Sequence, residues 1–155
     1  MKCEAMAWAA VVVVAACGGD DGDHHGGADG AVDCAQETRA DAFAPGMVKM
    51  GDNGTAVRLV EADPAPPARF DNAWVLAVED ASGAPRDDAQ VAVTPWMPDH
   101  GHGTPIEAVV TPRGSDGLYD VAPINLWMPG LWEIRIDATV DGVDDRVVFA
   151  FCIDE

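Results

Sequence analysis

The most regular hydrophobic pattern in the chain lies between Leu131 and Val140, where Trp132, Ile134 and Ile136 alternate with charged residues. Such a period of two predicts a β-strand with one face in the core and the other in water. The segment from Ala73 to Glu79 is instead apolar at successive positions. A strand of that kind has both faces covered, so we expect it near the middle of a sheet.

Turn residues separate further short apolar segments, and the only helical signal after residue 34 is a possible turn near 35–42. Asp52-Asn53-Gly54 is typical of a hairpin, because Asn-Gly accepts positive φ. Strands are predicted at 47–50, 55–61, 73–79, 89–94, 106–111, 118–125, 131–140 and 146–153. Seven or eight short antiparallel strands in about 120 residues predict an all-β fold, an immunoglobulin-like β-sandwich, with a small barrel as the alternative. Gly117-Leu118-Tyr119 is similar to the tyrosine corner of such sandwiches.

Residues 1–16 have the pattern of an export signal. Lys2 is followed by an almost entirely apolar run that ends at Ala16, and about twelve apolar residues are too few to span a bilayer. The four residues Val14-Ala15-Ala16-Cys17 resemble a bacterial lipobox. This resemblance implies cleavage before Cys17 and lipidation of its thiol, which would anchor the exported chain to a membrane of the cell envelope, facing the periplasm or the exterior.

Residues 17–33 are rich in glycine and aspartate and contain almost nothing that could form a core, so they predict a flexible tether. His24 and His25 within it could bind metal weakly, although a solvated linker is the commoner meaning of such a composition. The whole chain has a formal net charge of -18. That charge argues against nucleic acid and anionic lipid headgroups as partners, whereas cations are favoured.

Two cysteines lie within the predicted domain, residues 34–155. Lipidation of Cys17 and removal of Cys3 with the signal leave Cys34 and Cys152 in an oxidising compartment, so we expect them to form a disulfide. Neither belongs to a Cys-x-x-Cys motif, which argues against a redox role.

The densest group of metal-ligating side chains is Trp96-Met97-Pro98-Asp99-His100-Gly101-His102-Gly103-Thr104. Imidazole suits copper, zinc, iron or nickel, and a thioether shifts the preference towards copper(I). We expect Pro98 and the glycines to keep the segment irregular. In an extended backbone, His100 and His102 would point to the same side and could share one ion. The alternative is a histidine-rich turn whose imidazoles are hydrogen-bonded to backbone.

Strand direction brings one more methionine to this segment. Consecutive strands joined by short turns alternate in direction, so the connections 63–72, 96–105 and 127–130 should fall at one end of the sandwich. Met128 would then join Met97, His100 and His102. Both cysteines and the tether are predicted at the same end.

Three motifs together resemble the YtkA-like domain family: the Met-Pro, His-containing loop at 96–103, Gly117-Leu118-Tyr119, and Leu126-Trp127-Met128-Pro129-Gly130-Leu131-Trp132-Glu133-Ile134. The resemblance covers about residues 70–140. It implies an immunoglobulin-like sandwich in exported or membrane-anchored bacterial proteins, some of them encoded alongside copper or respiratory-oxidase functions. The chain has no cysteine beside the histidines, which excludes a blue-copper site of His₂Cys type.

Two functions are therefore open at the sequence level. The first is a copper-handling domain with His100 and His102 as nitrogen ligands and Met97 and Met128 as sulfur ligands. The second is a metal-free module that docks an envelope protein through Trp96, Pro98 and Trp127. We expect no enzymatic activity, because no serine or cysteine nucleophile lies in a recognisable motif beside a base.

Overall fold

The computed structural model describes residues 33–155, which form nine β-strands and, within that range, no helix. The predicted signal peptide, the lipidation site Cys17 and residues 18–32 of the tether lie outside the described residues. Residues 33–155 belong to one compact unit that contains every one of these strands. In residues 33–155 there is no helix that is long and apolar enough to cross a membrane.

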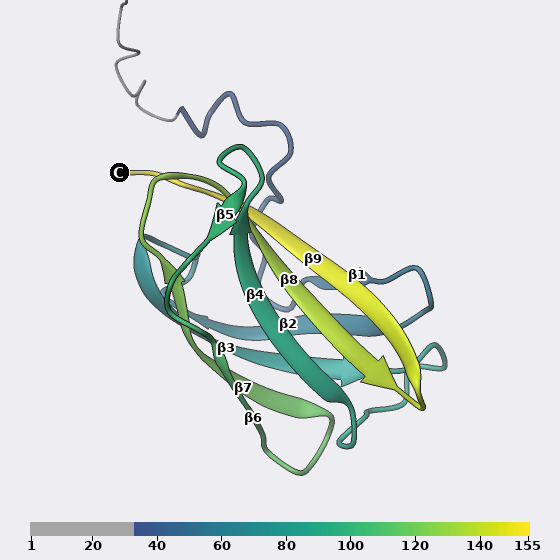
Figure 1. The fold of residues 1–155 in the computed structure, drawn as a ribbon. Helices are drawn as coiled ribbons and strands as arrows, with labels where there is room; N and C mark the ends of the chain where they lie inside the picture. Colours follow the sequence, from purple (N-terminus) through teal and green to yellow (C-terminus); the bar gives the residue numbers. More distant parts are fainter. Residues whose placement is uncertain (1–32) are drawn as a thin grey trace, which may run out of the picture. The chain divides into compact units, whose positions relative to one another are not determined.

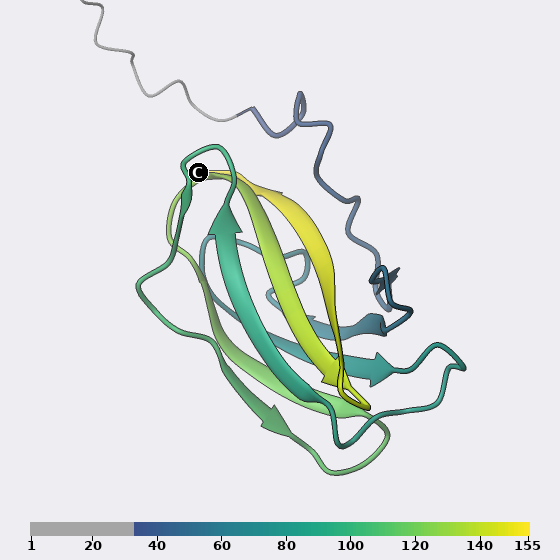
Figure 2. The same cartoon turned by 45° about the vertical axis from the view of Figure 1, so that its right-hand side comes forward.

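The strands form two antiparallel sheets that face each other (Figures 1 and 2). One sheet has the order β1-β2-β3-β7-β6, and its strands are β1 (Val48–Met50), β2 (Ala56–Asp63), β3 (Phe70–Glu79), β7 (Leu118–Leu126) and β6 (Val109–Pro112). The other has the order β5-β4-β8-β9, and its strands are β5 (His102–Gly103), β4 (Gln90–Met97), β8 (Gly130–Val140) and β9 (Val143–Ile153). The orders β2-β3-β7-β6 and β4-β8-β9 are those of strands A-B-E-D and C-F-G in an immunoglobulin sandwich, which confirms the predicted fold.

The core lies between the sheets and is made by the alternation seen in the sequence. Trp132, Ile134 and Ile136 of β8 are completely buried, as predicted. Across the interface, Trp74 of β3 contacts Phe149 and Phe151 of β9 edge-on, with ring centroids 6.2 and 5.9 Å apart. Edge-on aromatic pairs at these distances stabilise the packing of the two sheets, through the apolar area that they bury and through the favourable orientation of the rings.

The first hairpin and the central strand agree with the sequence prediction. β1 and β2 pair across Asp52-Asn53-Gly54, where Gly54 has φ +92°. β3 lies in the middle of its sheet, as its continuous apolar run predicted. The possible helical turn at 35–42 is only a short turn at Cys34–Gln36, with no helix.

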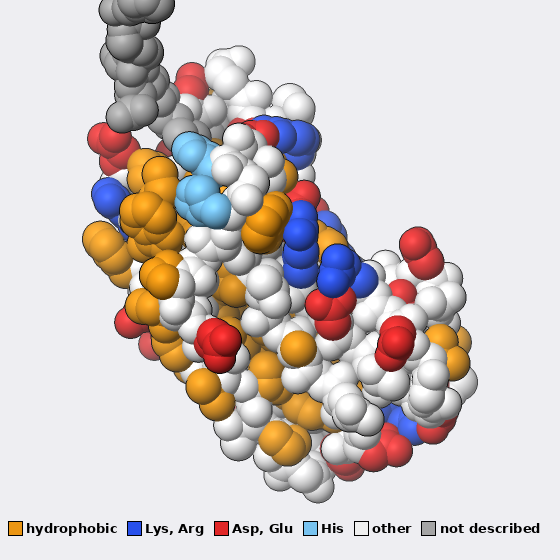
Figure 3. Space-filling model, viewed as in Figure 1, with side chains coloured by type: hydrophobic (Ala, Val, Ile, Leu, Met, Phe, Trp, Pro, Cys, Tyr) orange, Lys and Arg blue, Asp and Glu red, His pale blue; other side chains and the backbone are white. Residues whose placement is uncertain are grey.

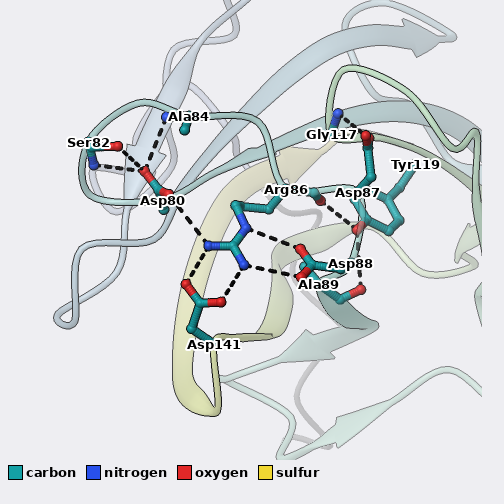
Figure 4. A network of polar contacts seen from close by, with 10 residues as sticks. All are labelled: Asp80, Ser82, Ala84, Arg86, Asp87, Asp88, Ala89, Gly117, Tyr119 and Asp141. Carbon is teal, nitrogen blue, oxygen red and sulfur yellow. Dashed lines mark hydrogen bonds and ion pairs between the residues drawn. The ribbon is translucent and has the colours of Figure 1, made fainter.

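The prediction of a tyrosine corner is wrong. Tyr119 begins β7, which corresponds to strand E, whereas the tyrosine corner belongs to strand F. Its buried hydroxyl donates to the carbonyl oxygens of Arg86 (2.7 Å) and Ala89 (3.2 Å) in the β3–β4 connection (Figure 4). Tyr119 therefore fixes that connection rather than the turn next to it.

A network of ion pairs reinforces the same end of the sandwich (Figure 4). The Arg86 guanidinium binds Asp141 of the β8–β9 turn and Asp88 of its own connection. The Arg86 hydrogen bonds hold the pKa values of both carboxyls below their ordinary range. Hydrogen bonds from the Ser82 hydroxyl and from the backbone of Ala84 and Ser82 lower the pKa of Asp80 to about 2. This network is structural and lies at the opposite end from the histidines.

Candidate functional site

The two histidines of the domain lie on a tight β-hairpin, not on an irregular loop. β4 continues to Met97, and β5 pairs back onto it with Met97 opposite His102 and Trp96 opposite Gly103. Residues 98–101 make the turn, closed by hydrogen bonds from the amides of His100 (3.3 Å) and Gly101 (2.9 Å) to the Met97 carbonyl. Gly101 has φ +67°, a conformation that a residue with a Cβ rarely adopts. We call residues 97–103 the His turn.

The His turn brings the imidazoles together by a different route from the one predicted. His100 lies in the turn itself and only His102 is in a strand, so the pair does not share one extended segment. Their ring centroids are nevertheless 5.5 Å apart. In the space-filling view the two described histidines lie side by side at the surface, next to hydrophobic side chains (Figure 3).

The His102 ring is held in one orientation. Its Nδ1 lies 2.9 Å from the carbonyl oxygen of Gly103. A carbonyl can only accept, so Nδ1 carries the hydrogen and the lone pair of the neutral ring is on Nε2. An imidazole that donates one N–H to a backbone carbonyl and leaves the other nitrogen free is the usual state of a metal-ligating histidine.

The β7–β8 loop supplies the second wall of the site. Trp127 stacks on His102, with ring centroids 6.0 Å apart and an angle of 26° between the planes. Trp127 is 40 % exposed to solvent. Its backbone carbonyl accepts a hydrogen bond from Arg69 Nε at 3.1 Å. The next residue, Met128, accepts a 2.9 Å hydrogen bond from the indole N–H of Trp132. A completely buried core residue therefore fixes the position of this loop.

The two methionines lie on the inner side of the site. Residues directly opposite each other in an antiparallel pair point to the same face, so Met97 and His102 are neighbours on the face that turns inward. Met97 is only 1 % exposed and belongs to the core, and Met128 is half-buried against it. The Met97 thioether therefore lies in the core and is not a surface ligand, whereas Met128 is partly open to solvent. All four predicted residues are at one end of the sandwich, as the strand directions predicted.

Trp96 points the other way, to the outer face of the sheet. It alternates with Met97 along β4, and the Arg135 guanidinium lies over its ring at 4.9 Å. The predicted docking surface of Trp96 and Trp127 is therefore not one continuous face.

The disulfide predicted between Cys34 and Cys152 is confirmed. It joins the start of the described chain to the end of β9, at the same end of the sandwich as the His turn (Figure 1). A bridge that spans 118 positions removes much of the freedom of the unfolded chain, which on the entropic model is the source of its stabilisation.

Sequence reasoning missed the contact that ties this segment to the His turn. Arg39 donates from Nη1 and Nη2 to the two carboxylate oxygens of Asp99, both at 2.7 Å. Arg39 Nε also donates to Glu37, and Nη2 donates to Glu37 as well as to Asp99. The Arg39 hydrogen bond holds the pKa of Asp99 below its ordinary range. Asp99 is evident in the sequence of the histidine segment, but no local spacing could pair it with Arg39, which lies 60 positions earlier.

Within residues 33–155, no three histidine, cysteine, aspartate or glutamate side chains are grouped so that they could hold a metal ion. Two imidazoles are fewer ligands than a tight site needs. A metal at the His turn would therefore depend on methionine sulfur as well.

These features define an immunoglobulin-like β-sandwich that carries a histidine hairpin and a methionine loop at one end. The chain belongs to the YtkA-like family, whose model matches residues 49–137. The match begins at β1, earlier than the three motifs suggested, and includes the His turn and the β7–β8 loop. No curated protein and no solved structure matches the chain.

Proposed function

We propose that this chain is a lipid-anchored, exported domain of the cell envelope that binds copper at the His turn and is not an enzyme. The observation that carries the copper assignment is the orientation of the His102 ring. Its Nδ1 donates to the Gly103 carbonyl, which leaves Nε2 free to bind a metal. The ring of His100 is close by, with its centroid 5.5 Å from that of His102. His100 and His102 would supply nitrogen ligands at the surface. Met97 and Met128 would supply sulfur from the core side.

The donor set favours copper over harder cations. Magnesium and calcium need several oxygen ligands, and the one carboxylate of the His turn, Asp99, already binds Arg39 with both oxygens. Imidazole and thioether remain, which suit copper in both oxidation states and copper(I) in particular. Met97 is buried and Met128 is half-buried, so copper(I) would have to pass the exposed side chains of the site to reach the Met97 sulfur.

The test is a titration of copper(I) and copper(II) into a chain that begins at Asp33, which removes His24 and His25 and keeps all nine strands and both cysteines of the disulfide. His100→Ala with His102→Ala should abolish copper(II) binding. Met97→Leu or Met128→Leu should weaken copper(I) by about tenfold, or ~1.4 kcal/mol, and leave copper(II) nearly unchanged. If the parent chain binds neither ion more tightly than the double-histidine variant, the copper proposal is wrong.

One observation supports the metal-free alternative. Trp127, Phe70 and Ile106 are 40 %, 57 % and 43 % exposed. A nearby groove of about 950 Å³ is lined in part by Phe43, Pro64 and Phe151. Exposed aromatic residues beside a groove are typical of protein docking sites. Failure of the copper titration would favour an envelope protein as the ligand.

A further inference from the structure

We propose that Arg39 is a positioning residue for the His turn: it ties the turn to the segment that the Cys34–Cys152 disulfide holds on β9. The part of this proposal that concerns copper affinity rests on the function proposed above. The part that concerns the geometry of the turn does not.

The contact itself has the geometry of a strong ion pair. The guanidinium presents two N–H groups to the two oxygens of Asp99, each at 2.7 Å. Glu37 accepts hydrogen bonds from the adjoining edge of the same guanidinium, from Nε at 2.9 Å and from Nη2, which also donates to Asp99, at 2.6 Å. Glu37 also accepts from the Arg39 amide at 2.7 Å, so the arginine is fixed at both its backbone and its head. A bidentate pair within such a network is better defined than an isolated surface pair.

The segment that carries Arg39 is anchored on both sides. Before it, Cys34 is bonded to Cys152 near the end of β9. After it, the Asp41 amide donates to the Ala150 carbonyl, and the Ala150 amide donates to the Asp41 carboxylate, both at 2.7 Å. Arg39 therefore reaches the His turn from a support that is fixed to the sheet on each side.

The position of Asp99 explains what the contact does. Asp99 lies between Met97, whose carbonyl closes the turn, and His100, whose ring has no side-chain hydrogen bond of its own among the described contacts. A fixed Asp99 restricts the backbone directly before His100, and so restricts where that ring lies relative to His102. The bidentate contact also removes the carboxylate from the set of possible ligands, which leaves nitrogen and sulfur.

The first test needs no metal. Amide exchange with water, measured by NMR, reports on the Gly101 amide that bonds the Met97 carbonyl. Asp99→Asn and Arg39→Gln should each speed that exchange about two- to fivefold, the range that a well-formed exposed ion pair supports. The amide of Ile134 in the core serves as an internal reference and should not change. An unchanged Gly101 rate in both variants overturns the proposal.

A matched control is available on the other side of the molecule. Arg113 binds Asp120 through Nε and Nη2, and the exposure of these side chains, 40 % and 49 %, is close to the 53 % and 51 % of Arg39 and Asp99. Arg113→Gln should leave the Gly101 rate as it is in the parent. Arg39→Lys should recover only part of the slow exchange, because an ammonium cannot bind both oxygens in the same geometry. Full recovery by lysine would contradict the bidentate role.

The second test links the turn to the disulfide. Cys34→Ser with Cys152→Ser removes the bridge without creating thiols that bind copper. In that background Asp99→Asn should change the Gly101 rate less than it does in the parent, because one support of Arg39 is already lost. Equal effects in the two backgrounds overturn the link. Should the bridge-free chain fail to fold, Asp99→Asn in the parent still decides the role of the ion pair.

Copper(II) affinity separates this inference from the proposed function. Asp99→Asn creates no new ligand beside the histidines, and high salt screens the effect of the lost negative charge, so the change in affinity that persists at high salt comes from positioning. We expect a two- to fivefold weaker affinity, matching the change in exchange. If the parent binds no copper but Gly101 exchange still responds, the copper proposal fails and the positioning role stands. If copper binds but Asp99→Asn changes neither the Gly101 exchange rate nor the copper affinity, the positioning role fails and the copper proposal stands.

Discussion

Replacing Trp132 by alanine tests the fold and the support of the methionine loop together. The side chain is completely buried on the inner face of β8, and its indole N–H donates to the Met128 carbonyl at 2.9 Å. A buried tryptophan covers roughly 150–250 Å², which at ~25 cal/mol per Å² is about 4–6 kcal/mol. This figure is an upper value, because alanine still buries a little of the area and because the unfolded chain already buries part of the tryptophan. The expected loss of unfolding free energy is therefore about 3–5 kcal/mol.

Urea unfolding of the chain that begins at Asp33, with the disulfide intact, measures this loss as a lower midpoint at constant slope. Trp132→Phe is the control, because it keeps an aromatic ring in the core but removes the hydrogen-bond donor and the smaller ring of the indole. It should cost about 1–2 kcal/mol, since the Met128 carbonyl loses its partner. A loss below about 1 kcal/mol for Trp132→Ala would place the ring at the surface and refute the strand register.

Three further predictions concern the disulfide, the Asp80 carboxylate and the lipidation site. Reduction of the Cys34–Cys152 bridge should lower the unfolding free energy by up to about 4–5 kcal/mol in urea titrations, and mass spectrometry of the unreduced chain should show no free thiol at either position. Asp80 should titrate near pH 2 by carbon-13 NMR, from an ordinary value of 3.8. Because the folded pKa is lowered, the stability that Asp80 contributes is present above pH 4 and is lost as the pH falls towards 2, and Ser82→Ala should move the midpoint back up. Cys17→Ser should leave the exported protein unacylated and free of membranes; equal partitioning of variant and parent would contradict the lipobox.

Most of the strands were predictable from the sequence because they carry signals of their own, and the two-residue β5 was not. The alternation of β8, the continuous apolar run of β3 and the Asn-Gly turn are local features, and local features set the period and direction of a strand. The alternating direction of consecutive strands was then enough to predict that Met128 lies at the end of the sandwich that holds the His turn. The burial of Met97 was also within reach, because Val91, Val93, Pro95 and Met97 lie on one alternating face of β4.

The parts that were missed depend on contacts between distant segments. β5 has only two residues, and Pro98 and Gly101 beside it signal a turn, so no pattern could show that His102 pairs with Met97. The bond between Arg39 and Asp99 spans 60 positions. Tyr119 was assigned to the wrong strand because the identity of a strand in a sandwich depends on the order of the sheets, which a strand's own residues do not encode.

The most direct measurement of the central claim is nitrogen-15 NMR of the histidine rings before and after copper(I), a diamagnetic ion, is added. Without metal, His102 should show a protonated Nδ1 and an unprotonated Nε2, as its bond to Gly103 requires. One equivalent of copper(I) should shift the Nε2 signal of His102 and one nitrogen of His100, and the methyl groups of Met97 and Met128 should shift with them. Ring signals that do not move, or a His102 that binds through Nδ1, would contradict the account of the His turn as a copper site.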